Sequence, residues 1–131
     1  MGQSLSEGEF PCPSAPVMSI FLVQTYAVER EKKSKYKAMM KKIHQNLRKH
    51  ADDLPELLAY RTFESGVEGP LIRFVEVFEF EDQDGRERFF RRFTEARWLR
   101  ALAQHFGDVV DRSRVQNVVW TEFLREEWFV R

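Results

Sequence analysis

The sequence predicts a single α+β domain in which strands and helices follow one another in the order β-α-β-β-α-β. The spacing of the apolar residues changes along the chain between a period of two, typical of strands, and a period of about 3.6, typical of amphipathic helices. Turn-forming sequences separate these segments, notably GVEG at 66–69 and DQDG at 82–85. At 131 residues, the chain is long enough for one hydrophobic core.

The first strand is expected at 18–28 and the first helix at 32–52. The segment MSIFLVQTYAV is rich in β-branched and aromatic residues and contains no strand breaker. In the following segment the lysines and arginines lie mostly on one side of a helix, which should end before Pro55. The apolar residues at helical spacing are Tyr36, Met39, Met40, Ile43, Leu47, Ala51 and Leu54.

The second and third strands are expected at 56–65 and 70–81, joined by the GVEG turn. Because the connection between them is short, they should pair as an antiparallel hairpin. The third strand contains the run IRFVEVFEFED, in which Glu76 interrupts a series of aromatic and aliphatic residues.

The second helix is expected to begin with Asp82 or Asp84 as its N-cap. Its apolar stripe consists of Phe89, Phe93, Ala96, Leu99, Leu102, Ala103, Phe106, Val109 and Val110. A long last strand is predicted at 114–130, with a tail rich in aromatic residues. This order of elements is that of the ferredoxin-like fold, in which a four-stranded antiparallel sheet carries both helices on one face.

The composition argues against a nucleic-acid or membrane partner. The 21 basic and 21 acidic side chains cancel, so the basic side of the first helix is interpreted as a solvated surface. No segment approaches the roughly 20 apolar residues that span a bilayer. The single cysteine, Cys12, fits a reducing cytoplasm. Residues 1–17 are predicted to be a flexible leader, and residues 18–131 the domain.

The second face of the predicted sheet requires a partner. In the third strand, Val75 and Val77 alternate with Phe74, Glu76 and Phe78, so neither face is mainly polar. Helices can cover only one of these faces. We therefore expect a homodimer in which two such sheets bury their open faces against each other.

The chain resembles the dimeric α+β barrel superfamily, which includes antibiotic-biosynthesis monooxygenase-like proteins, haem-degrading oxygenases and stress-responsive barrel proteins. The resemblance covers about residues 18–130 and rests on the order of elements, on the FVEVFEFED strand leading into an aromatic-rich helix, and on the long last strand. It implies that two sheets close into a barrel around an interior cavity.

Glu76 is the principal candidate for a catalytic residue, because a buried carboxylate is costly unless it is paired, hydrogen-bonded or protonated. In a hairpin that turns at 65–69, Arg61 falls opposite or diagonal to Glu76. Together with Glu122 and Gln24, these residues could form a polar cluster inside the barrel. The cluster is either a pocket in which Glu76 is a base oriented by Arg61, or a buried ion pair that fixes the strand register.

Further side chains are expected to contact a ligand. Phe74 and Phe78 share the strand face of Glu76, and Trp120 alternates in step with Glu122 on the last strand. Trp98 and His105 lie on one flank of the second helix and could stand at a cavity mouth.

No cofactor and no metal ion is expected. The resemblance to haem-degrading proteins implies an Asn, Trp and His set, but this chain offers Gln24 in place of Asn, and places Trp98 and His105 on the same helix. His44 and His50 are six residues apart and do not share a helix face, so they lack the spacing of a helical metal site.

Two functions remain open. One is a homodimer that binds a small apolar or aromatic molecule and carries out a cofactor-independent, monooxygenase-like reaction on an aromatic or polyketide-like substrate. The other is a dimeric binding or structural module without catalysis. An open cavity beside Glu76 favours the first, and a filled interior favours the second.

Overall fold

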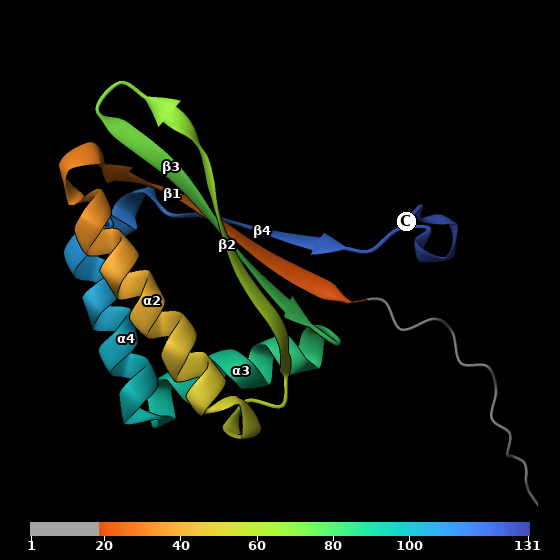
Figure 1. Cartoon of the computed structure of the whole chain (residues 1–131). Coiled ribbons are helices and arrows are strands. Elements are labelled where there is room, and N and C mark those ends of the chain that lie inside the picture. Colours follow the sequence, from red (N-terminus) through yellow and green to blue (C-terminus); the bar gives the residue numbers. More distant parts are fainter. Residues whose placement is uncertain (1–18) are drawn as a thin grey trace, which may run out of the picture.

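The structure of the protein is a computed structural model that describes residues 19–131; the predicted leader at 1–17 lies outside the described residues. Four strands form one antiparallel sheet in the order β2-β3-β1-β4, and the helices cover one face of it (Figure 1). This arrangement confirms the predicted ferredoxin-like α+β fold. Among the described residues, no helix combines the length and apolar character needed to cross a membrane.

The strands β1 (Ile20–Glu29) and β3 (Leu71–Phe80) form the middle of the sheet. They pair without interruption, and β4 (Gln116–Thr121) pairs along the other edge of β1. Because side chains alternate along a strand, every second residue points toward the helices. The buried residues of β3 are Ile72, Phe74, Glu76, Phe78 and Phe80.

The hairpin between β2 (Leu57–Glu68) and β3 turns later than predicted, at Gly69 and Pro70. Gly69 has a φ of 58°, a left-handed conformation that glycine adopts without a steric penalty. The ladder between the two strands shifts register between Leu57 and Ala59 and again between Glu64 and Gly66. Each shift leaves one residue of β2 unpaired, which defines a β-bulge.

The first helix, α2 (Lys33–Lys49), lies close to its predicted position, between short 3-10 turns at Arg30–Lys32 and Ala51–Asp53. It buries Tyr36, Met39, Met40 and Ile43 against the sheet.

The predicted second helix consists of two helices, α3 (Gln83–Glu95) and α4 (Arg97–Val109), so its prediction as one continuous helix was wrong. Asp82 caps α3, and its side chain accepts a hydrogen bond of 2.7 Å from the Gly85 N–H. Between the two helices, the backbone of Ala96 is extended. This break turns the chain so that Phe89 of α3 and Leu99 of α4 both reach one core cluster.

The last strand is shorter than predicted, because β4 covers six residues. Leu124 has a left-handed backbone with a φ of 52°, and a 3-10 turn follows at Arg125–Glu127. Residues 122–131, here called the C-terminal arm, extend past the end of the sheet and away from the helices (Figure 1).

Candidate functional site

A cavity of about 300 Å³ lies between the sheet and the helices. Its polar lining consists of Gln24, Tyr60 and Glu76. The remaining lining residues are Ile43, Leu47, Phe78, Phe89, Phe90, Phe93, Leu99, Leu102, Ala103, Phe106 and Val115. The volume is at the lower end of the range typical of small-molecule sites, and a few polar groups in an apolar wall are typical of such sites too.

Glu76 is held in the cavity wall by the register of three strands. It lies in the middle of β3, with Gln24 of β1 directly opposite on one side and Thr62 of β2 on the other. All three side chains therefore face the helices. Only 3% of the surface of Glu76 is exposed.

Tyrosine hydroxyls surround the Glu76 carboxylate. Tyr60 of β2 donates a short hydrogen bond to Glu76 Oε2. Tyr26 of β1 also interacts with the carboxylate, and its hydroxyl lies 2.6 Å from the hydroxyl of Tyr36 on α2. A chain of polar groups thus runs from Tyr36 through Tyr26 and Glu76 to Tyr60. Among the side chains that the structure describes, which are those of residues 19–111 and 113–131, no lysine or arginine forms an ion pair with Glu76.

The surroundings of Glu76 shift its pKa toward neutrality. Burial raises the pKa from its usual 4.5 to about 7, although the hydrogen bonds from Tyr60 and Tyr26 oppose this shift by stabilising the ionised form. A carboxyl group with this pKa exists in both protonation states near neutral pH. It can therefore accept a proton and release it again, as general acid–base catalysis requires.

The three tyrosines remain protonated at neutral pH. Burial raises the pKa of Tyr26, Tyr36 and Tyr60 above their usual value, and the nearby Glu76 charge raises it further. These hydroxyls therefore act as hydrogen-bond donors and not as bases. Glu76 is the base among these four groups.

His44 of α2, which the sequence analysis considered only as a metal ligand, is a half-buried neighbour of this cluster. Its Nε2 lies 3.3 Å from Thr62 Oγ1, and its ring centroid lies 5.0 Å from that of Tyr60. Burial, followed by the charge of Arg48, lowers the pKa of His44. The imidazole is therefore mainly neutral at neutral pH, so that it adds no positive charge to stabilise ionised Glu76.

The predicted contact between Arg61 and Glu76 is wrong. Arg61 points to the face of the sheet that the helices do not cover, here called the open face (Figure 1). Its side chain is 54% exposed there, and its Nη2 lies 3.5 Å from Glu79 Oε1. Its place beside Glu76 is taken by Tyr60. The Glu76 face also lies against the helices of its own chain, and not inside a sheet-to-sheet barrel as predicted.

Glu122 is buried, but it lies at the start of the C-terminal arm and does not line the cavity. Its Oε1 accepts hydrogen bonds from the Ser19 N–H at 2.7 Å and from Arg125 Nη1 at 3.2 Å. Trp120 lies on the open face of β4 and is also outside the cavity lining. Of the predicted polar cluster, the structure brings together only Glu76 and Gln24.

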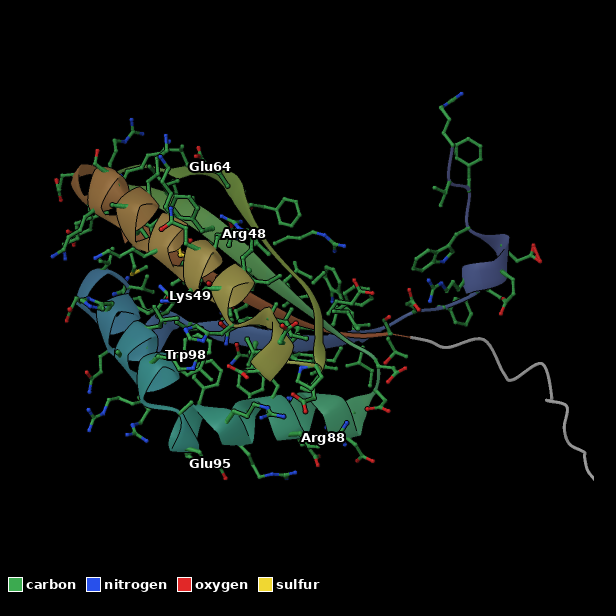
Figure 2. The ribbon with its side chains drawn as sticks, turned by 60° about the horizontal axis from the view of Figure 1, so that its bottom comes forward. Arg48, Lys49, Glu64, Arg88, Glu95 and Trp98 are labelled. Carbon is green, nitrogen blue, oxygen red and sulfur yellow. The ribbon has the colours of Figure 1, made fainter. Side chains whose placement is uncertain are left out.

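Among the other predicted ligand contacts, Phe78 lines the cavity, whereas Phe74 packs on Tyr36 with ring centroids 4.2 Å apart. The Trp98 ring stacks on the His50 ring beside the end of α2, with ring centroids 4.1 Å apart (Figure 2). His105 is exposed, and its Nδ1 lies 4.0 Å from Asp108 Oδ2.

Trp98 and His105 therefore do not meet in one site. In addition, no group of three or more His, Cys, Asp or Glu side chains within residues 19–131 has an arrangement suited to a metal ion.

Taken together, the sheet order, the helices on one face and the cavity between the sheet and the helices define a ferredoxin-like α+β domain with a pocket. No family model and no curated protein matches the sequence. Solved structures resemble the fold. A NIPSNAP family protein of unknown function from Agrobacterium tumefaciens is 16% identical, with a TM-score of 0.61 over 82% of this chain and 91% of that one.

Two other solved structures are similar at the same level. A candidate antibiotic biosynthesis monooxygenase from Nitrosomonas europaea is 13% identical, with a TM-score of 0.59 over 82% of this chain and 92% of that one. A dimeric ferredoxin-like protein of unknown function from Thermobifida fusca is 17% identical, with a TM-score of 0.53 over 82% and 93%. These similarities confirm the resemblance at the level of the fold.

Proposed function

We propose that this protein binds a small, mostly aromatic molecule in the cavity and carries out a monooxygenase-like reaction on it without a cofactor. The observation that supports this proposal is Glu76, a buried carboxylate that has no cationic partner among the described residues and faces an apolar cavity of about 300 Å³. The fold-level similarity to a candidate monooxygenase agrees with the proposal.

In the proposed reaction, the substrate itself reduces oxygen. Glu76 removes a proton from an activated methylene group, and the resulting carbanion transfers electrons to O₂. One oxygen atom forms a carbonyl at that carbon and the other leaves as water, so that R–CH₂–R′ and O₂ give R–CO–R′ and H₂O. The aromatic lining excludes water and orients the ring, while Gln24 and Tyr60 offer hydrogen bonds to a polar substituent.

We further propose that the working unit is a homodimer formed through the open sheet face. Apolar side chains on this face are half exposed, including Phe63 of β2 and Val118 and Trp120 of β4. Exposed apolar area of this kind is typical of an interface. One of the similar structures is described as dimeric.

Binding is tested by fluorescence titration with 2-naphthol, a small aromatic molecule with one hydroxyl group. Glu76→Gln keeps the size of the side chain but removes the charged acceptor, so we expect the affinity to fall by about tenfold or more. Glu79→Gln makes the same change on the opposite face of the same strand and should bind like the wild type. Equal affinity of wild type and Glu76→Gln would refute the role of the cavity.

Catalysis is tested separately by oxygen uptake with anthrone, an aromatic compound with an activated methylene group, and no added flavin or metal. We expect the wild type to accelerate uptake and Glu76→Gln not to do so. The rate should rise with pH around 7, because the ionised form of Glu76 is the base. Binding without accelerated uptake would favour the alternative, a binding module without catalysis.

A further inference from the structure

The C-terminal arm presents more exposed apolar surface than any other segment of comparable length among the described residues. Phe123, Phe129 and Val130 are 77%, 81% and 82% exposed, respectively. Leu124 and Trp128 are about half exposed. Five large apolar side chains in ten residues are unfavourable in water, and such a cluster marks an interaction surface.

The arm has a defined shape of its own. Glu122 fixes its start, because the Ser19 N–H donates to the carboxylate at 2.7 Å and the Glu122 N–H donates back to the Ser19 carbonyl at 3.4 Å. Leu124 adopts the left-handed conformation that turns the chain, and Trp128 Nε1 donates to the Phe123 carbonyl at 2.7 Å. Leucine rarely adopts this conformation, which persists only where the surroundings require it. The arm is thus shaped for contact before any partner binds.

The arm does not cover its own sheet. It extends past the ends of β1 and β4, clear of the helices and the other strands (Figures 1 and 2). Outside the arm, the large apolar side chains that remain exposed lie on the two edge strands, β2 and β4. They are Leu58, Phe63, Val67, Val118, Val119 and Trp120.

We infer that the arm is exchanged between two copies of this chain and packs against the start of β2 in the second copy, around Leu58. This inference rests on the proposed homodimer. When two identical sheets stack face to face about an axis parallel to their strands, the β4 edge of each lies over the β2 edge of the other. The C-terminal end of β4 is level with the start of β2, because Thr121 pairs with Ile20, Ile20 with Phe80, and Phe80 with Leu57.

The surface around Leu58 is suited to the arm. A bulge leaves Leu58 without a partner in the ladder, and its side chain is 53% exposed. Arg61, three residues further along β2, is 54% exposed although its Nη2 lies 3.5 Å from Glu79 Oε1 of the same chain. The arm carries Glu126 and Glu127 in its 3-10 turn. Apolar contact around Leu58 and opposite charges beside it therefore complement the arm.

The area of the two arms agrees with that of a stable dimer. An aromatic side chain offers roughly 150–250 Å², so the exposed parts of Phe123, Trp128 and Phe129 amount to about 400 Å² in each arm. Each arm would cover a similar area, about 400 Å², on the second copy. Two exchanged arms and the surfaces that they cover then bury about 1,600 Å² in total, the size of a standard specific interface.

The test compares the full chain with a variant that ends at Thr121 and with Phe129→Ser/Val130→Ser, by sedimentation over a range of concentrations. We expect the full chain to be dimeric, and both variants to self-associate at least about 100-fold more weakly. Gln45→Ser changes an exposed residue on α2, away from the arm, and should leave the dimer intact. The double serine variant changes only exposed side chains, so it tests the arm even if the truncated chain folds poorly.

The proposed contact between the arm and the start of β2 in the second copy is tested by disulfide trapping in a Cys12→Ser background. A chain with Leu58→Cys is mixed with a chain carrying Phe123→Cys, and oxidation should yield a covalent heterodimer; a Gln45→Cys chain, with its cysteine on the outer side of α2, should not be trapped. A dimer that persists in both arm variants would overturn the exchange of arms but leave the proposed dimer standing. A full chain that stays monomeric at all concentrations would overturn both.

Discussion

Glu76 combines two properties that are seldom found together without a functional reason. It is almost completely buried, and its hydrogen-bond partners are tyrosine hydroxyls and not a cationic group. A structural ion pair would have stabilised the charged form, whereas here burial raises the pKa of Glu76 to about 7. The residue therefore lowers the stability of the folded protein in the pH range in which its ionised form could act as a base.

This cost predicts how stability depends on pH. The folded pKa is about 7 and the usual value is 4.5. Between these values the folded state holds a proton that the unfolded state has released, so the free energy of unfolding should fall as the pH rises from about 4.5 through 7. Once Glu76 is fully ionised, above pH 7, the free energy of unfolding has fallen by about 3 kcal/mol in total.

Glu76→Gln cannot ionise at this position. The free energy of unfolding of this variant, measured with urea at pH 5 and pH 8, should therefore fall between these conditions by about 2.5 kcal/mol less than that of the wild type. Glu79→Gln should keep the fall seen in the wild type. An equal fall in the wild type and in Glu76→Gln would show that the carboxyl group titrates near its usual value.

At the level of the elements, the β2–β3 hairpin decides which residue meets Glu76. If the ladder continued from the turn without a bulge, Arg61 would pair with Phe78 and share the face of Glu76. The bulge at Ser65 inserts one residue, so that Arg61 pairs with Val77 and Tyr60 takes the inner position. A shift of one residue moves every following side chain to the other face of a sheet.

The hairpin also shows which features the sequence can predict. Apolar periodicity identified the strands, α2 and the order of the fold, because these depend on long patterns. A bulge, the break at Ala96 and the left-handed Leu124 depend on single residues in tertiary context, which periodicity does not report. The alternation of Tyr60 and Thr62 with Arg61 could have indicated Tyr60 as a partner of Glu76 if the bulge had been foreseen.

The bulge leads to a prediction about deletions in β2. Deleting Ser65 straightens the ladder but keeps Tyr60 opposite Phe78, so it should change the free energy of unfolding by about 1 kcal/mol or less. Deleting both Glu64 and Ser65 turns Tyr60 outward and Arg61 inward, and should cost more than about 3 kcal/mol.

Urea unfolding of the two deletion variants tests this prediction. The shorter deletion should also retain the 2-naphthol affinity of the wild type, since Tyr60 stays beside Glu76. Equal destabilisation by the two deletions would mean that the register is not set by the bulge.

At the scale of the whole molecule, the two faces of the sheet have different roles. The helix-covered face contains the cavity, whereas the open face presents apolar side chains that the helices of the same chain do not cover. Phe63 lies on this open face, opposite Val75, and is 51% exposed. Because Phe63 is exposed on this face and far from the cavity lining, it is a suitable position at which to test for a dimer.

If the open face is an interface, the thermal unfolding temperature of the wild type should rise with protein concentration, because association stabilises the folded state. Phe63→Lys would place a charge against the second copy, and a buried unpaired charge is strongly unfavourable. We therefore expect this variant to sediment as a monomer with an unfolding temperature independent of concentration. Gln45→Lys adds a lysine to the outer side of α2 and should behave like the wild type. Phe63→Lys leaves the arm intact, so a dimer that survives this change would place the interface elsewhere than on the sheet face.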